Sequence, residues 1–375
     1  MHVQREHQWV EVDLDAIRKN VAAFRASTGR KILAVVKANG YGHGAANVAK
    51  AVFAAGGEYV GVTSLGEAAA LRSSGVNGKI LVMGPQFPHE YARVPELDVE
   101  CVVWTKEQAL ALNSIGMTAG VPSKAHVKVD IGMSRFGLLP AEAPEFLRTL
   151  SELPGLQVVG LASHLSASDE DASITSSQLK RFRALVEILE AERLRPPLVH
   201  VSNSGASSSY PELWFDMVRL GIVLYGYPAL PDAEVNDALT PALSWKARIV
   251  SLREIPAETT VSYGGEYKTK HAERIGVIAA GYTDGFRRTP KNCNEVLVRG
   301  HRLKTLGRIC QQFCMVNLDD VPEVRVGDEV TLLGSERGER ISAVDIARRW
   351  GTNEWDVLCG IAGTIERRYL HSADS

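Results

Sequence analysis

The stretch Lys31-Ile-Leu-Ala-Val-Val-Lys-Ala-Asn-Gly-Tyr-Gly-His-Gly44 shows how the first half of the chain is built. Residues 32–36 form an apolar, β-branched run, which predicts a strand buried on both faces. The run ends at Lys37, and residues 39–44 contain too many glycines for a strand or a helix. Residues 45–55 then repeat apolar side chains at helical spacing. The stretch therefore predicts a strand, a tight turn and a helix, with a lysine at the end of the strand.

The position of Lys37 suggests a chemical role. A lysine at the tip of a buried strand has a short, fixed reach, and apolar surroundings favour its neutral amine. A neutral amine can attack an aldehyde, so Lys37 is a candidate Schiff-base lysine. On this stretch alone, the favoured interpretation is an ordinary lysine that extends its charged end into solvent.

The composition indicates an enzyme-sized globular protein. The chain has 375 residues, of which 45% are hydrophobic and 23% charged, with a formal net charge of -2. This length predicts two domains, or one barrel with an appendage. Neither the net charge nor any run of lysine and arginine suggests a nucleic-acid or membrane surface.

The N-terminal segment and the cysteines indicate the compartment. Residues 1–9 are polar and do not resemble a signal peptide, and no apolar run approaches membrane-spanning length. Of the five cysteines, Cys310 and Cys314 are close in sequence without a second half-site. We therefore expect a cytoplasmic protein with reduced thiols, no bound metal, and no nucleic-acid or membrane partner.

The first two thirds of the chain alternate between strand-like and helical patterns, which predicts parallel strands with crossover helices. About eight strands are expected, and eight close a (β/α)8 barrel of the TIM type. The predicted strands are 32–36, 59–62, 80–83, 99–103, 126–129, 158–162, 198–201 and 222–224. The predicted helices are 14–24, 45–55, 65–74, 106–115, 142–150 and 178–193.

Polar groups gather at the ends of these predicted strands. They include Lys37, Thr63, Trp104, Asp130, His164, the segment 202–204 and Tyr225. In a barrel of this type all strand ends meet at one rim, where active sites form.

The alternation stops near residues 229–238, which are polar and rich in turn formers. Short alternating segments follow at 245–252, 259–263, 275–279, 295–299 and 329–333, which predict a mostly β domain. One helix is expected at 343–350, with Ser342 as its N-cap. We therefore expect a barrel over residues 13–238 and a β domain over 239–375, joined by an N-terminal strand at 8–12.

Seven motifs in this order resemble the alanine racemase family, pyridoxal 5'-phosphate enzymes with a barrel followed by a β domain. The motifs are AVVKANGYGHG (34–44), KVDIGMSR (128–135), HVSNS (200–204), MVRLGIVLYG (217–226), VSYG (261–264), GYTDG (281–285) and GRIC (307–310). The resemblance extends over nearly the whole chain.

The resemblance implies how the cofactor would be bound. Lys37 would be joined to pyridoxal 5'-phosphate and Tyr41 would lie beside it. Backbone amides near Ser204, Gly221 and Ile222 would receive the phosphate, which suits a hydroxyl beside closely approaching N–H groups. Taken without the resemblance, Ser204 belongs to an ordinary helix cap or turn.

Three further residues would surround the cofactor ring. Arg219 would face the pyridine nitrogen, and because arginine cannot accept a proton, the ring would stay neutral and withdraw electrons less strongly. His164 would lie near the ring, although a core histidine is an equal interpretation of the sequence. Arg135 would reach the phenolic oxygen or the substrate carboxylate, although an isolated arginine often forms a surface ion pair.

Tyr263 would be the second catalytic residue. Inversion of an α-carbon needs a base on one face and an acid on the other, and Lys37 and Tyr263 could supply these. In the family the tyrosine comes from the second subunit, which implies a homodimer with composite sites. Tyr282 would line the substrate side, and Lys128 matches a lysine that can be carbamylated and orients Arg135.

The chain departs from the family at two places. Gln311-Gln312-Phe313 stands where members usually have Met-Asp-Gln, in a loop that holds the substrate carboxylate and crowds its side chain. Trp355 stands where a tyrosine usually contacts the phosphate. With Lys37 and Tyr263 kept, these changes suggest the same chemistry on alanine or on a related, larger or polar amino acid.

Three other functions remain open. A fold-related decarboxylase would carry a carboxylate at the pyridine nitrogen, where this chain has Arg219. A lyase or aldol-cleaving enzyme could use the altered 311–313 loop. A non-catalytic cofactor carrier would lack the β domain and Tyr263.

Overall fold

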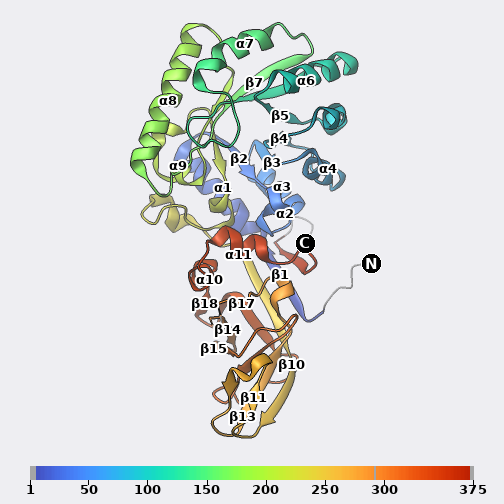
Figure 1. The fold of residues 1–375 in the computed structure, drawn as a ribbon, viewed down its shortest axis with the longest axis vertical. Helices are drawn as coiled ribbons and strands as arrows, with labels where there is room; N and C mark the ends of the chain where they lie inside the picture. The colour runs from blue at the N-terminus through green and yellow to red at the C-terminus, as the bar shows by residue number, and fades with distance from the viewer. Residues whose placement is uncertain (1–5, 291–292, 372–375) are drawn as a thin grey trace. The chain divides into compact units, whose positions relative to one another are not determined.

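The computed structural model describes residues 6–290 and 293–371. Contacts between Cα atoms divide these residues into two compact units, which can be followed in Figure 1. The barrel unit contains residues 15–40 and 45–241. The β unit contains the described parts of residues 1–14, 41–44 and 242–375.

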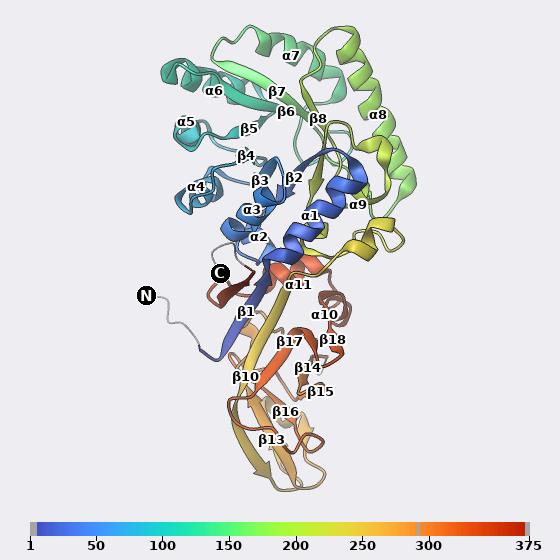
Figure 2. The same cartoon turned by 180° about the vertical axis from the view of Figure 1, so that it is seen from behind.

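The barrel unit is built on a parallel sheet whose order is β8-β7-β6-β5-β4-β3-β2-β9. Successive strands along the chain are mostly neighbours, as crossover helices require. Figure 2 shows α4, α5 and α6 on one side of these strands and α8 on the other. The strands are β2 (Lys31–Val35), β3 (Tyr59–Val62), β4 (Lys79–Val82), β5 (Glu100–Val103), β6 (Ser123–Lys128), β7 (Leu156–Ala162), β8 (Leu198–His200) and β9 (Met217–Leu220).

The helices of the barrel unit begin at residues that can cap them. Ser64 accepts a hydrogen bond from Glu67 N, and Thr105 forms a capping box with Gln108. The helices are α1 (Leu14–Thr28), α2 (Lys37–Tyr41), α3 (Ala45–Ala54), α4 (Leu65–Ser73), α5 (Val94–Leu97), α6 (Lys106–Ala119), α7 (Ala143–Ser151), α8 (Ala172–Ala191) and α9 (Ser204–Ser209). Short 3-10 turns lie at η1 (Pro88–Arg93), η2 (Pro140–Glu142), η3 (Pro211–Leu213), η4 (Ile222–Tyr225) and η5 (Glu234–Ala238).

Strands β8 and β9 end the sheet order and are joined differently from the other neighbours. Asp216 N, just before β9, donates to Val199 O in β8 at 3.1 Å. Arg219 in β9 donates from its side chain to His200 O, the last carbonyl of β8, at 3.0 Å. A buried guanidinium therefore takes part in joining the two end strands, where a regular ladder would otherwise be expected.

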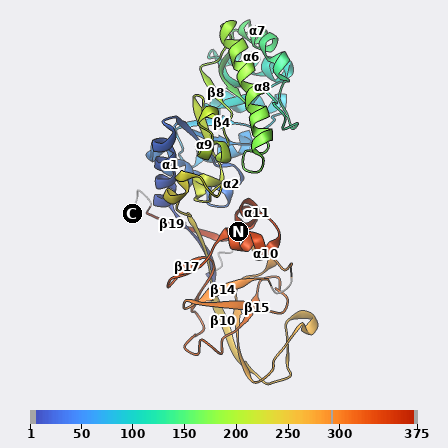
Figure 3. The same cartoon turned by 90° about the vertical axis from the view of Figure 1, so that its left-hand side faces the viewer.

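The β unit contains a sheet of order β18-β17-β14-β15-β16-β13-β10-β1-β19 and a small pair β11-β12. Strand β10 can be followed in Figure 3; it pairs antiparallel with β1, β13 and β17. The strands are β1 (Gln8–Asp13), β10 (Leu243–Ile255), β11 (Thr260–Val261), β12 (Tyr267–Lys268), β13 (Glu273–Ile278), β14 (Glu295–Val298), β15 (His301–Leu306), β16 (Cys314–Asn317), β17 (Glu329–Glu336), β18 (Glu339–Ile341) and β19 (Glu366–Leu370). The helices are α10 (Ala343–Trp350) and α11 (Glu354–Gly360), with 3-10 turns η6 (Tyr263–Gly265) and η7 (Tyr282–Asp284).

The predicted fold class, a barrel followed by a mostly β domain, is confirmed, but three local predictions were wrong. Residues 222–224 lie in the 3-10 turn η4, and the last barrel strand is β9 at residues 217–220. The predicted strand 259–263 is too long, because β11 covers only residues 260–261 and Tyr263 lies in the turn η6. Helix α11, capped by Asn353, was missed. No helix in the described part of the chain is both long and apolar enough to cross a membrane.

Candidate functional site

Lys37 lies two residues after the end of β2 and opens a left-handed turn. Ala38, Asn39 and Gly40 have φ angles of 52°, 53° and 62°, which are costly for the first two residues because of their β-carbons. The turn is held by two backbone donors: Gly40 N bonds to Val36 O at 2.8 Å, and Ala38 N bonds to Glu67 at 2.7 Å. The backbone that carries Lys37 is therefore fixed.

Glu67 ties the ends of two neighbouring strands together. Its second carboxylate oxygen accepts from Thr63 N at 2.7 Å, just after β3. Its own N–H bonds to Ser64 Oγ at 3.2 Å at the start of α4. One carboxylate therefore holds the strand-end residues Ala38 and Thr63, which lie at the rim where the sequence placed its candidate site.

Arg219 is the polar centre of the barrel rim. It is buried, and burial lowers its pKa to about 10, so the guanidinium stays charged near neutral pH. Nη1 donates to His200 Nδ1 and His200 O, both at 3.0 Å. Nη2 donates to Ser163 O at 2.8 Å, Val201 O at 3.0 Å and His164 Nδ1 at 3.1 Å. No acceptor among the described residues bonds to Nε, which remains available to a ligand.

His164 lies beside Arg219 and accepts a hydrogen bond from it. Burial, followed by the charge of Arg219, holds the pKa of His164 well below its usual range. The imidazole is therefore neutral, and because Nδ1 accepts from Arg219, its proton is on Nε2. His164 thus presents an N–H donor together with the flat face of a neutral ring.

A small pocket opens beside these residues. It is lined by Lys128, Val129, Asp130, Met133, Arg135, Phe136 and His164. Arg135 lies over the ring of Phe136, 5.0 Å from its centroid, and Phe136 stacks on Trp104 at 4.9 Å. Burial, then the charges of Arg219 and Arg135, place the pKa of Lys128 well below its ordinary value. The pocket therefore combines a guanidinium cation, an amine whose charged form is disfavoured, and an imidazole.

Ser204 and Gly221 meet on another side of the barrel unit. Ser204 Oγ accepts from Gly221 N at 2.9 Å, and the next residue, Ile222, begins η4. The first N–H groups of α9 and η4 have no acceptor within their own turns, as at any helix start. A hydroxyl and several backbone donors in one place form a donor set that fits a phosphate.

In the β unit, Tyr263 and Tyr282 share one cation. The guanidinium of Arg288 lies 5.8 Å from the ring centroid of Tyr263 and 5.9 Å from that of Tyr282. Both rings are exposed, at 62% and 43%. Ser262, just before Tyr263, has a φ of 66° and donates to Arg308 O at 2.6 Å. A strained backbone held by a neighbour therefore presents Tyr263 outward.

The loop 310–313 has a fixed backbone and outward side chains. Gln311 O accepts from Thr283 N at 3.1 Å and from Thr283 Oγ1 at 2.7 Å. Cys310 N bonds to Phe313 O at 2.8 Å. Gln311 and Phe313 are exposed and Gln312 is half-buried. The departures from the family motif therefore change side chains on a loop whose backbone is secured.

The two remaining candidates, Tyr41 and Trp355, also lie in the β unit. Tyr41 is buried, and burial raises the pKa of its phenol, followed by the effect of Cys359. Its neighbour Gly42 accepts from Arg367 Nε at 3.0 Å. Trp355 is half-buried in the first turn of α11.

The structure brings together His164, Arg135, Lys128 and Arg219 in the barrel unit, and Tyr263 with Tyr282 in the β unit. The sequence interpretation missed His200, His126 and Glu100, which continue the contacts of Arg219 into the barrel. It also missed Arg288. A charged or imidazole side chain within an otherwise apolar predicted strand was the available signal for Glu100 and His126.

Comparisons with known proteins agree over the full length. The model of the alanine racemase N-terminal domain matches residues 12–229, and the model of the C-terminal domain matches residues 242–369. An alanine racemase of Halothermothrix orenii is 38% identical over 364 residues, which cover 96% of each protein.

Solved structures of alanine racemases also match this chain over nearly its full length. An alanine racemase of Clostridium difficile 630 superposes with a TM-score of 0.91 at 32% identity, covering 98% of this chain and 96% of that one. An alanine racemase of Bacillus anthracis with bound L-Ala-P gives 0.89 at 33% identity, with coverage of 98% and 96%. This chain therefore belongs to the alanine racemase family.

Proposed function

We propose that the chain interconverts L- and D-alanine with pyridoxal 5'-phosphate as cofactor, using Lys37 and Tyr263 as the two acid–base groups. The observation that carries this proposal is the buried Arg219, held by imidazoles and carbonyls and left with one free N–H, at Nε. Its guanidinium donates and never accepts, so it suits a ring nitrogen that stays unprotonated. A decarboxylase of related fold would have a carboxylate at the ring nitrogen, in the place that Arg219 takes here. No carboxylate among the described residues contacts Arg219.

The residues of the chain divide the work of binding. Arg219 Nε would donate to the ring nitrogen, His164 would lie against the ring, and Ser204, Gly221 and Ile222 would hold the phosphate, with Tyr41 and Trp355 completing the set. When bound, the cofactor supplies an electrophilic carbon for the amino group and a ring that withdraws electrons from the α-carbon. Arg135 would neutralise the substrate carboxylate or the ring oxygen.

Proton transfer falls to two groups. Lys37 would remove or return the α-proton on one face through Nζ, and Tyr263 would do so on the other face through its phenolic oxygen. The guanidinium of Arg288 lies 5.8 Å from the centroid of the Tyr263 ring, so a cation stands beside this residue. We propose that Tyr263 reaches the site from a second copy of the chain, so that a homodimer holds two composite sites.

A mixing experiment tests both the residues and their origin. Lys37→Ala and Tyr263→Phe should each reduce racemisation by several orders of magnitude. When the two inactive proteins are exchanged into hybrid dimers, one site regains an intact Lys37 and an intact Tyr263. Activity should recover to about one quarter of wild type, the fraction expected for random pairing of two-fold dimers. No recovery would contradict the composite site.

A spectroscopic control keeps these assignments separate. Lys37→Ala should lose the visible absorbance of the lysine-linked cofactor, whereas Tyr263→Phe should retain it. If Lys37→Ala keeps that absorbance, Lys37 is not the attachment site. Tyr263→Phe should slow abstraction of the α-proton from the L isomer more than from the D isomer, measured as exchange of that proton with solvent deuterium. If both abstractions slow equally and only slightly, the two-base scheme is wrong, because each base should serve one isomer.

A second candidate, racemisation of a larger or polar amino acid, is favoured by the loop 310–313. Its backbone is secured by Thr283, whereas the side chains of Gln311 and Phe313 face outward in place of the usual residues. Gln312→Asp should shift the preference toward alanine, measured as the ratio of kcat/KM for alanine to that for other amino acids. An unchanged ratio would argue against a role for this loop in specificity. Product analysis in the same assay would reveal a lyase.

We also propose domain limits and a location. Residues 13–238 would form the cofactor-binding barrel and residues 239–375 the β domain, supported by the pairing of β1 with β10 and β19. Limited proteolysis near residues 229–241 should release two stable fragments. A cytoplasmic location is supported by the composition and is tested by cell fractionation.

A further inference from the structure

A chain of buried polar side chains runs away from Arg219 into the barrel. Arg219 Nη1 contacts His200 Nδ1 at 3.0 Å, and His200 Nε2 lies 2.9 Å from His126 Nδ1. His126 Nε2 lies 2.7 Å from Glu100 Oε2. All four side chains belong to residues that are at most 6% exposed. We call Arg219, His200, His126 and Glu100 the imidazole chain.

The imidazole chain crosses the barrel from one end to the other. Glu100 is the first residue of β5, whereas His200 is the last residue of β8. Glu100 Oε1 accepts from Tyr59 at 3.3 Å, and the Tyr59 hydroxyl accepts from Lys79 Nζ at 3.3 Å. Tyr59 and Lys79 begin β3 and β4, and Lys79 is exposed. Six strands therefore contribute to one path, where barrels usually contain layers of branched apolar side chains.

Each proton in the imidazole chain is fixed by its neighbours. Arginine can only donate, so His200 Nδ1 must carry no proton, and the proton of His200 is on Nε2. His200 then donates to His126 Nδ1, which leaves the proton of His126 on Nε2, facing the Glu100 carboxylate. Reversing one ring would place two donors or two acceptors face to face, at a cost of about 1–3 kcal/mol for a buried unsatisfied group.

The backbone around His126 is adapted to this ring. A β-carbon on Gly160 in the neighbouring strand β7 would stand 2.0 Å from His126 Nδ1 and 2.5 Å from Cε1. The β6–β7 register also shifts between Ala125 and His126, so that His126 faces Gly160. A glycine and a bulge therefore make room for the imidazole at the middle of the chain.

We propose that Glu100, His126 and His200 are positioning residues for Arg219. By holding both imidazoles in the Nε2–H form, Glu100 presents a bare nitrogen to Arg219 Nη1 and keeps Arg219 Nε as the free donor. The part concerning catalysis rests on the proposed placement of the cofactor ring nitrogen at Arg219 Nε. The part concerning the protons does not depend on it.

The first test is the ¹⁵N NMR spectrum of the holoenzyme with labelled histidine. His126 and His200 should each show one protonated nitrogen, Nε2, and one bare nitrogen, Nδ1. The two signals are assigned by their loss in His126→Asn and His200→Asn. A protonated Nδ1 on either ring in the wild-type protein would overturn the proposal, whatever the function of the enzyme.

The second test separates loss of an acceptor from loss of a charge. Glu100→Leu removes the acceptor of His126, so the ¹⁵N pattern of His200 should change and kcat should fall about tenfold with KM altered less. Glu100→Gln keeps an amide oxygen that can accept the same bond, and should restore most of both. Wild-type spectra and kcat in Glu100→Leu would show that Glu100 positions nothing.

A matched control tests for a general effect of removing a buried carboxylate. Glu273 in the β unit is also buried and also accepts from a tyrosine, Tyr267, at 2.6 Å. Glu273→Leu should leave the histidine spectrum and kcat unchanged. An equal loss in Glu273→Leu and Glu100→Leu would assign the effect to stability and would overturn the positioning role.

A cofactor analogue with carbon in place of the ring nitrogen links the chain to the proposed site. With that analogue, Glu100→Leu and wild type should have similar kcat, because Arg219 Nε has nothing left to contact. If the tenfold difference persists while the ¹⁵N results hold, the proposed placement of the ring nitrogen is wrong and the positioning of Arg219 stands.

A steric variant probes the same chain without touching a titratable group. Gly160→Ala places its β-carbon against the ring of His126, and should alter the ¹⁵N signals of His126 and His200 and lower kcat severalfold. Gly66→Ala, in helix α4 of the same unit, meets Ser64 Oγ at an ordinary 3.6 Å and should change neither. Unchanged signals in Gly160→Ala would contradict the described packing of His126.

Discussion

The carboxylates of Glu100 in the barrel unit and Glu295 in the β unit are both held by nitrogen donors, but they differ in their access to water. The side chain of Glu100 is 8% exposed and its partner His126 is fully buried. Glu295 is 17% exposed, and it accepts from Arg302, which is 34% exposed, at 3.1 Å. Burial is therefore the main difference between the two groups.

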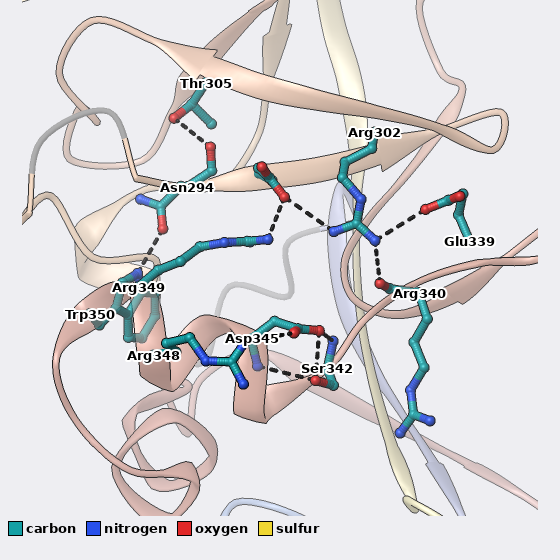
Figure 4. Close-up of polar contacts among 11 residues, drawn as sticks. Asn294, Arg302, Thr305, Glu339, Arg340, Ser342, Asp345, Arg348, Arg349 and Trp350 are labelled. Atoms are coloured by element: carbon teal, nitrogen blue, oxygen red, sulfur yellow. Dashed lines mark hydrogen bonds and ion pairs between the residues drawn. The ribbon is translucent and has the colours of Figure 1, made fainter.

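Figure 4 shows the second group, which we call the arginine network. Arg302 also donates to Glu339 at 3.1 Å and to Arg340 O at 2.6 Å, and Arg349 donates to Glu295. Its donors are all guanidinium groups, which have one protonation form and can exchange a lost partner for water. Such networks are worth about 0–1 kcal/mol per exposed pair.

The imidazole chain behaves differently because neither water nor a second tautomer can replace a lost partner. Each ring has one nitrogen that must donate and one that must accept, so a single change is transmitted along the whole chain. The comparison predicts that equal substitutions will have unequal effects in the two units.

The largest effect is expected for Arg219→Leu. The substitution leaves two imidazole nitrogens and three carbonyls without their donor and removes one of the links between β8 and β9. We expect the free energy of unfolding of the barrel unit to fall by about 3–5 kcal/mol, as when one partner of a buried charged network is removed. Amide hydrogen exchange of the barrel strands measures this loss separately from the β unit.

Arg302→Leu is the matched control in the β unit. It also removes an arginine with carboxylate and carbonyl partners, but its loss should be about 1 kcal/mol or less because water reaches the site. Equal losses for the two variants would mean that burial does not distinguish the two networks.

The sequence predicted the barrel and several polar residues in it, but not the contacts that form the imidazole chain. The alternation of patterns identified the barrel, and the residues after the strands identified Lys37 and His164. Glu100 and His126 were visible as polar residues within apolar strands. Their contacts could not be predicted, because His126 and His200 are 74 residues apart and meet only when the barrel closes.

The error at residues 222–224 has a local cause. Ile222, Val223 and Leu224 are as apolar as a buried strand, and short apolar runs do not distinguish a strand from a buried turn. Gly221 before them has φ −94° and ψ −105°, and Gly226 after them has a φ of 87°. The backbone therefore turns at both ends, and the true strand lies at 217–220, where Arg219 interrupts the apolar pattern.

The next effect is the dependence of barrel stability on pH. Burial, then the charge of Arg219, holds the pKa values of His164 and His200 well below their usual range, whereas both titrate near 6.5 in the unfolded chain. Below about pH 6.5 the unfolded state therefore binds more protons, so stability falls as the pH falls. Two such histidines contribute a loss of about 2 kcal/mol between pH 6.5 and 5.5, because each is half protonated in the unfolded chain at pH 6.5 and almost fully protonated at pH 5.5.

This loss should appear in the hydrogen exchange of the barrel strands between pH 6.5 and 5.5, after correction for intrinsic exchange rates. Glu100 does not add to this loss in the same range: burial would raise its pKa, but the hydrogen bond from His126 and the charges of Lys79 and Lys124 bring the pKa below the usual value. A flat profile in the barrel strands would show that His164 and His200 are charged, and would contradict the protons assigned to the imidazole chain.

The smallest effect is expected for Arg349 of the arginine network and for its neighbour Arg348, which differ in their contacts and in their exposure. Arg349 donates to Glu295 and is 23% exposed, whereas Arg348 is 77% exposed and lies 4.0 Å from Asp345. Arg349→Gln should lower the free energy of unfolding of the β unit by about 0.5–1 kcal/mol, and Arg348→Gln should leave it within about 0.5 kcal/mol of wild type. High salt should reduce the difference between them, because these charges are screened by ions. If Arg349→Gln instead cost as much as Arg219→Leu, the partly exposed network would be as sensitive as the buried one, and access to water would not be the property that separates the two.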